Sequence, residues 1–99
     1  MAGDPLKVAS DVSKLLMENN RVRVFIAKFQ PGVKAAMHSH PDHVIYVLNG
    51  SKIKMTSPGK KATDIELKTG QAIFLEAQSH EVVNIGKTNL ELLIIELKE

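Results

Sequence analysis

The stretch GVKAAMHSHPDHVIYVLNG, residues 32–50, determines how the rest of the chain is interpreted. Between its two glycines lie three of the four histidines of the protein, His38, His40 and His43. On an extended strand, side chains two residues apart point to the same face, with Cα atoms about 6 to 7 Å apart. His38 and His40 can therefore bind one ion, as in sites where zinc–nitrogen bonds are about 2.0 to 2.1 Å long.

The other two histidines need a local explanation before they can join this pair. His43 lies three residues after His40, so a straight strand would point it to the opposite face. Because proline removes a ladder donor, a bend with one extra residue at Pro41–Asp42 would return His43 to the same side. His80 lies in QSHEVVN, residues 78–84, which is typical of a strand that could lie across a barrel from the first cluster. The four histidines are therefore candidate ligands of one metal ion, and a histidine pH sensor is the alternative.

Turn signals recur at short intervals on both sides of the histidine-rich stretch. They are Pro31-Gly32, Asn49-Gly50, Pro58-Gly59, Thr69-Gly70 and residues 86–89. The segments between them are short and rich in valine, isoleucine, leucine and phenylalanine. Short apolar segments separated by regularly spaced turns predict an all-β sandwich or barrel.

Individual segments support the strand prediction. RVRVFIAKF, residues 21–29, begins with strict alternation of arginine and valine, which is the period of a strand. VIYVLNGSKIKM, residues 44–55, predicts a hairpin with a type I′ turn at Asn49-Gly50. TDIELKTGQAIFLEA, residues 63–77, predicts a second strand pair with Gly70 near its turn, and NLELLIIELK, residues 89–98, predicts a last strand.

The segment DVSKLLMEN, residues 11–19, fits either a short helix or an edge strand. We expect a strand there, because every later segment is β. Two other segments, residues 44–48 and 92–97, are apolar on both faces. One face can line a barrel interior, and the other requires a partner, so we expect a homodimer or a larger assembly. A two-layer sandwich that buries both faces within one chain is the alternative.

Composition narrows the class of protein. The chain has 99 residues, the size of a single domain, and 43 % of them are hydrophobic. It has no cysteine, which excludes disulfides and thiolate metal sites. The net charge is only +2 and aromatic residues are 4 %, so a nucleic-acid surface is not expected. MAGDPLKVAS, residues 1–10, lacks an apolar signal-peptide core and no apolar run approaches a membrane span, so we expect a cytoplasmic protein without membrane contact.

Two stretches of the chain resemble the two sequence motifs of small cupins. The first cupin motif is Gly, five residues, His-x-His, three or four residues, Glu, six residues and Gly, and residues 32–50 match it with His43 at the glutamate position. The second is Gly, five residues, Pro-x-Gly, two residues, His, three residues and Asn. Residues 70–84 match its first glycine and its His80-to-Asn84 spacing. They depart from it at Glu76, where the motif has proline, and at Gln78, where it has glycine. The loop before His80 is also one residue shorter than in the motif.

The resemblance implies a single cupin domain over residues 1–99, folded as a double-stranded β-helix, which is a jelly-roll barrel. It implies a metal inside the barrel, toward its mouth. The ligands transferred by position are His38, His40, His43 and His80, of which His43 replaces a glutamate. The chain is thus similar to the branch of small cupins with four histidine ligands.

The four histidines form one set of candidate ligands, so we expect one metal ion per chain. Their chemistry favours a divalent transition metal. Neutral imidazoles disfavour magnesium and calcium and suit zinc, nickel, iron or copper, and the cupin resemblance adds manganese. The expected function is a metal-dependent oxidoreductase or dioxygenase acting on a small organic substrate. A non-catalytic metal- or ligand-binding cupin for sensing or storage and a metal-dependent isomerase remain open. Asp42, Glu76 and Glu81 either orient the imidazoles or are exposed acids.

Overall fold

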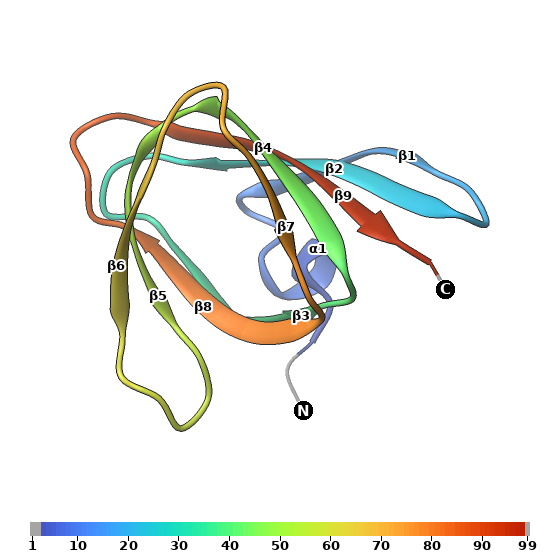
Figure 1. Cartoon of the computed structure of the whole chain (residues 1–99), viewed down its shortest axis with the longest axis horizontal. Helices are drawn as coiled ribbons and strands as arrows, with labels where there is room; N and C mark the ends of the chain where they lie inside the picture. Colours follow the sequence, from blue (N-terminus) through green and yellow to red (C-terminus); the bar gives the residue numbers. More distant parts are fainter. Residues whose placement is uncertain (1–2, 99) are drawn as a thin grey trace.

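The computed structural model describes residues 3–98 and folds almost entirely into strands (Figure 1). One short helix precedes them, α1 (Pro5–Val8). The strands are β1 (Ser13–Glu18), β2 (Val22–Phe29), β3 (Lys34–His40), β4 (His43–Asn49), β5 (Ser51–Thr56), β6 (Thr63–Leu67), β7 (Ala72–Leu75), β8 (Gln78–Asn84) and β9 (Leu90–Leu97). The all-β prediction is confirmed.

The strands form two sheets that enclose one interior. The order is β1-β2-β9-β4-β7 in the five-stranded sheet and β3-β8-β5-β6 in the four-stranded sheet. All strand pairs within them are antiparallel. The chain crosses repeatedly from one sheet to the other, as in a jelly roll, and Figure 1 shows the strands wrapping around the space between the sheets.

Strict alternation along the strands builds the core. On β9, Leu90, Leu92, Ile94 and Glu96 are buried, and the residues between them are only half-buried. On β2, Phe25 and its alternating neighbours Ala27 and Phe29 face the interior in the same way. A side chain on either sheet therefore faces the core or the outside according to its parity along the strand.

The predicted hairpin at Asn49-Gly50 is wrong. Strands β4 and β5 follow each other there, but they belong to different sheets and do not pair. Gly50 does not adopt the positive φ of a type I′ turn. Glycine is needed instead because a Cβ at this corner would collide with the backbone carbonyl of Leu67. Its N–H donates to Thr69 Oγ1 at 2.9 Å, which fixes the crossing between sheets.

The second predicted strand pair is also a crossing. Strands β6 and β7 exist, but β6 pairs with β5 in one sheet and β7 pairs with β4 in the other. Gly70 between them has a φ of 89°, a left-handed conformation that favours glycine. The turn was correctly located, and the pairing partner was not.

At the start of the chain, the predicted edge strand is confirmed as β1, which pairs with β2. The sequence did not predict helix α1 before it. Pro5 lies at its first turn, and the Asp4 side chain accepts from the N–H of Leu6 at 3.0 Å, which caps the helix. Helix α1 packs beside β3, the strand that carries two of the histidines.

Candidate metal centre

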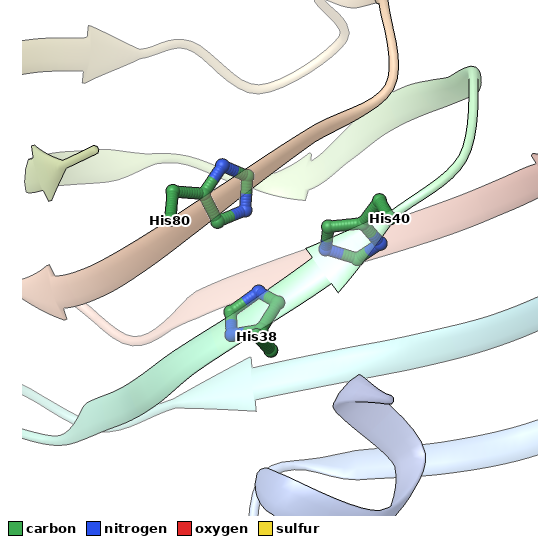
Figure 2. A group of neighbouring side chains, drawn as sticks. All are labelled: His38, His40 and His80. Carbon is green, nitrogen blue, oxygen red and sulfur yellow. The ribbon is translucent and has the colours of Figure 1, made fainter. Parts of the chain in front are cut away.

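Three of the four histidines meet on two paired strands. His38 and His40 lie on β3, and His80 lies on β8 directly opposite His38 in the antiparallel register. All three are buried, and one ring nitrogen of each lies within 4.8 Å of the others (Figure 2). We expected His80 from across the barrel, but it comes from the neighbouring strand, because β3 and β8 pair. The two sequence motifs therefore meet by direct strand pairing.

His43 approaches this group from the other sheet. It is the first residue of β4, and its side chain is completely buried. Its ring stacks on that of His40, with centroids 4.4 Å apart and planes at 24°. His43 does not belong to the trio whose nitrogens lie within 4.8 Å. It faces the interior because the chain changes sheets at Pro41–Asp42, and not because of the extra bulge residue that we expected.

The Nδ1 atom of every histidine contacts an oxygen. The partners are Ala36 O for His38 (2.7 Å), Glu96 Oε2 for His40 (2.6 Å), Pro41 O for His43 (2.8 Å) and Gln78 Oε1 for His80 (3.0 Å). The Gln78 amide is oriented by its Nε2, which donates to the carbonyl of Glu76 at 3.2 Å. Since these oxygens accept, the ring proton is assigned to Nδ1 in each histidine. Every Nε2 is then left with a free lone pair, which is the form that binds a metal.

The Nε2 of His43 is the one buried side-chain polar atom without a hydrogen-bond partner in residues 3–98. Leaving a buried acceptor unsatisfied costs about 1–3 kcal/mol. A bound cation would satisfy this lone pair, so the donor set present here fits a metal ion that accepts imidazole nitrogen.

Burial keeps the rings of His38, His43 and His80 neutral. It lowers the pKa of His80 to about 3, with a smaller contribution from the neighbouring histidines. Burial also holds the pKa values of His38 and His43 below their ordinary range. Neutral imidazole is the form that coordinates metals, so these three rings need no deprotonation at neutral pH.

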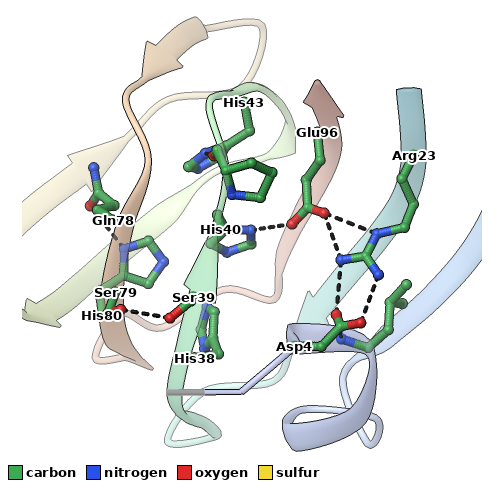
Figure 3. A network of polar contacts seen from close by, with 12 residues as sticks. Asp4, Arg23, His38, Ser39, His40, His43, Gln78, Ser79, His80 and Glu96 are labelled. Carbon is green, nitrogen blue, oxygen red and sulfur yellow. Dashed lines mark hydrogen bonds and ion pairs between the residues drawn. The ribbon is translucent and has the colours of Figure 1, made fainter. Parts of the chain in front are cut away.

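A chain of charged groups supports His40 from behind (Figure 3). Glu96 receives the Nδ1–H of His40 and also the guanidinium of Arg23 at 2.6 Å, and Arg23 in turn contacts Asp4 at 2.8 Å. Burial alone would raise the pKa of Glu96, but the His40 hydrogen bond and the Arg23 charge outweigh it and lower that pKa. Glu96 is therefore an anion that orients the His40 ring.

Glu96 is not among the site residues predicted from the sequence. Its signal was available, because it is the lone acidic residue at an inward position of the alternation Leu90, Leu92, Ile94, Glu96. A carboxylate at a position otherwise reserved for core residues indicates a buried partner. No spacing rule connects it to His40, which lies 56 residues earlier in the chain.

The three acids considered beforehand have other contacts. Asp42 Oδ1 accepts from the N–H of Ala77 at 2.8 Å and so joins the start of β4 to the loop before β8. Glu81 pairs with Lys34 at 3.0 Å on the outer face, and Glu76 is exposed. Within residues 3–98, none of these carboxylates hydrogen-bonds a histidine ring.

Comparison with known proteins agrees with this architecture. The family model for the cupin domain matches residues 25–96. The oxalate-binding protein of Thermotoga maritima is 31% identical over 94 residues, which cover 91% of this chain and 74% of that protein.

Solved structures show the same fold. A cupin domain from Bordetella pertussis superimposes with a TM-score of 0.82 at 24% identity, over 89% of this chain and 93% of the other. A predicted oxalate decarboxylase from Thermotoga maritima superimposes with a TM-score of 0.63 at 25% identity, over 86% and 77% of the two chains. No helix within residues 3–98 is long and apolar enough to cross a membrane. With its family-model match, its curated relative and its jelly-roll topology, the chain belongs to the cupin family.

Proposed function

We propose that His38, His40, His43 and His80 together hold one divalent transition metal ion through their Nε2 atoms. The observation that carries this proposal is the common hydrogen-bond pattern of the four rings. Each Nδ1 is used by an oxygen, so each Nε2 is left as a donor of electrons to a cation. The buried Nε2 of His43, which has no protein partner, supports its inclusion with the other three.

The donor set selects among metals. Imidazole nitrogen favours zinc, nickel, iron or copper, and manganese remains in the set. Four neutral ligands leave the ion's positive charge uncompensated, and Glu96, the carboxylate that accepts from His40, is already paired with Arg23. Such an ion, when bound, would polarise a substrate oxygen, lower the pKa of bound water or, if redox-active, react with dioxygen.

The proposed function is that of a metal-dependent cupin acting on a small organic molecule, with oxidation by dioxygen as the proposed reaction. The second candidate is binding without turnover, and it is favoured by the curated relative, which is named an oxalate-binding protein. Oxygen uptake by protein loaded with iron or manganese, measured with candidate substrates, separates the two. Ligand binding without oxygen uptake would favour the binding function.

The ligand set is tested by changing His43. We expect His43→Ala to weaken metal retention while the barrel stays folded, because one ligand is lost. His43→Glu should retain metal, since a carboxylate can replace the imidazole. The measurement is metal content after dialysis, with circular dichroism to verify folding and Asn49→Ala, an exposed change on the same strand, as control. Unchanged metal affinity in His43→Ala would reduce the proposed site to three histidines.

We also propose that the protein forms a homodimer through the outer face of the five-stranded sheet. Register places two rows of apolar residues on this face: Met17, Val24, Ile95, Val44 and Phe74 in one, and Ile26, Leu93, Tyr46 and Ala72 in the other. Phe74 is 56% exposed and Tyr46 is 41% exposed. On the described strands of this face, charged side chains are confined to Lys14, opposite Ile26, and to the Lys28–Glu91 pair. A largely apolar surface of this kind is typical of an interface.

The outer face of the four-stranded sheet offers a matched contrast for the dimer test. Lys52 lies opposite Glu66 and Lys54 lies opposite Asp64 in that sheet, so its surface is charged. We expect Phe74→Lys to convert the dimer to a monomer in light scattering, and Lys54→Ala to leave the mass unchanged. A monomeric wild-type protein at micromolar concentration would contradict the proposal. The proposed cytoplasmic location is tested separately by cell fractionation.

A further inference from the structure

A partly enclosed cavity lies between the sheets, beside the trio of histidines. Its volume is about 190 Å³, and His38, His40 and His80 form part of its wall. The remaining wall is aliphatic and aromatic, with side chains such as Phe25 and Ile53 from the two sheets. Apart from the histidines, Ser13 is the one polar residue of the lining, and no lysine, arginine, aspartate or glutamate contributes to it. The cavity therefore has a polar patch at one place and apolar walls everywhere else.

The absence of charge from the lining restricts the ligand. Arg23 is the nearest arginine to the site, but Asp4 holds it at 2.8 Å and Glu96 holds it at 2.6 Å. A charged group placed in the apolar part of the cavity would have no partner of opposite charge, and its burial would be costly. A ligand can therefore carry a charged or strongly polar group only where that group reaches the histidines or the ion they hold.

The size of the cavity sets the size of the apolar part. An apolar cavity of about 150 Å³ engineered into another protein stays dry and binds benzene. The cavity here is somewhat larger, at about 190 Å³, and includes the space beside the histidine nitrogens. A single six-membered ring with one short polar group fits this volume.

We propose that the natural ligand of this site is a small molecule with one oxygen-bearing head and one apolar body of about the size of a single ring. The head lies at His38, His40 and His80, which line the cavity, and the body lies against the apolar wall. This proposal deepens the proposed function and rests on it, because the head is assigned to the metal. It assigns a ligand class distinct from oxalate, which has two charged groups and no apolar body.

The test compares ligands that share a head and differ in body. Protein loaded with zinc is titrated calorimetrically with benzoate and with acetate. We expect benzoate to bind at least tenfold more tightly than acetate, because only its ring can fill the apolar space. Equal affinities for the two, or tighter binding of oxalate than of benzoate, would overturn the proposal.

A pair of variants on β8 locates the binding. Val82 lines the cavity, and Val83 lies on the opposite face of the same strand, between Lys34 and Lys54. Val82→Phe should reduce benzoate affinity at least tenfold and leave zinc content and acetate affinity unchanged. Val83→Phe, the same change facing outward, should alter none of these. Full benzoate affinity in a folded Val82→Phe protein would place the ligand elsewhere and overturn the proposal.

Metal-free protein separates this inference from the proposed metal site. Benzyl alcohol, an uncharged ring compound, should bind metal-free wild type and Val83→Phe, and should not bind Val82→Phe. That result supports the apolar subsite even if zinc fails to bind, which would refute the metal centre alone. Retained zinc without any preference for ring compounds would refute the apolar subsite alone.

Discussion

Within residues 3–98, the barrel contains two buried polar clusters, and they differ in how completely their hydrogen bonds are satisfied. At one end, the Asn84 side chain donates to the carbonyls of Phe29 at 3.0 Å and Thr88 at 2.9 Å. Its Oδ1 accepts from Ser51 Oγ at 2.8 Å and from the N–H of Gly86 at 3.0 Å. At the other end, the histidines use Nδ1 in the same way but leave Nε2 available.

This difference separates a structural polar group from one that is ready to bind. Asn84 and His80 lie four residues apart on β8, and both are buried. Asn84 has no capacity left for a ligand, because both its donors and its acceptor are used. The histidine cluster has capacity left, and it faces a cavity. Burial alone does not distinguish the structural role from the binding role. The distinction lies in the lone pairs of the histidine Nε2 atoms, which no hydrogen bond among the described residues uses.

Removing the satisfied group should have the largest effect on folding. Asn84→Ala leaves two carbonyls, one N–H and the Ser51 hydroxyl without their partner, so we expect a loss of at least about 3 kcal/mol in the free energy of unfolding. Urea denaturation measures it, with Asn89→Ala, an exposed change, expected to cost less than about 0.5 kcal/mol. The folded fraction of Asn84→Ala should keep its metal. A loss of metal without a loss of stability would reverse the proposed roles of the two clusters.

Acid should weaken the histidine cluster and leave the asparagine cluster unaffected, because only the imidazoles titrate. The pKa of His80 is about 3 in the folded protein and 6.5 when unperturbed. Below pH 6.5 the unfolded chain takes up a proton that the folded protein refuses, so stability falls as pH falls toward 3. Between pH 7 and pH 5, His80 alone should contribute a loss of about 2 kcal/mol in metal-free protein.

This pH dependence is measured by urea denaturation at the two pH values, with the His80 ring followed by NMR. His38 and His43, whose pKa values are also lowered, add to the slope. The variant His80→Gln should show a shallower dependence than wild type. A His80 ring that titrates near pH 6.5 in the folded protein would contradict the expectation.

The smallest expected effect concerns the carboxylate that orients His40. Glu96→Gln keeps an acceptor oxygen for the His40 Nδ1 but removes the negative charge. We therefore expect about a tenfold loss in metal affinity, the lower end of the range for residues that hydrogen-bond a metal ligand. Glu91→Gln on the same strand, where Glu91 pairs loosely with Lys28 at 3.8 Å, is the matched control. Competition with a coloured chelator measures both. Equal affinities in the two variants would remove Glu96 from the support of the site.

The sequence predicted strands and turns well because both depend on local pattern. Alternation and glycine-containing turns located β2, β4, β5 and β9, and the β character of every later segment correctly favoured a strand at β1. Alternation does not specify which strand is the neighbour, so the crossings at Asn49-Gly50 and Gly70 were interpreted as hairpins. Histidine spacing identified the rings that gather in the interior. Contacts between distant segments, such as Glu96 with His40, leave no trace in local spacing.

The placement of the four histidines on both sheets has a kinetic consequence. His38, His40 and His80 belong to one sheet and His43 to the other, so the full set assembles only after the sheets close on each other. Closure depends on distant partners, since His40 on β3 meets Glu96 on β9 across 56 residues, and such topologies fold slowly. We expect an ion held by all four rings to stabilise contacts that form after the folding barrier, because those contacts need both sheets in place. It would therefore slow unfolding and leave the folding rate unchanged, which makes the metal a determinant of how long the barrel stays closed.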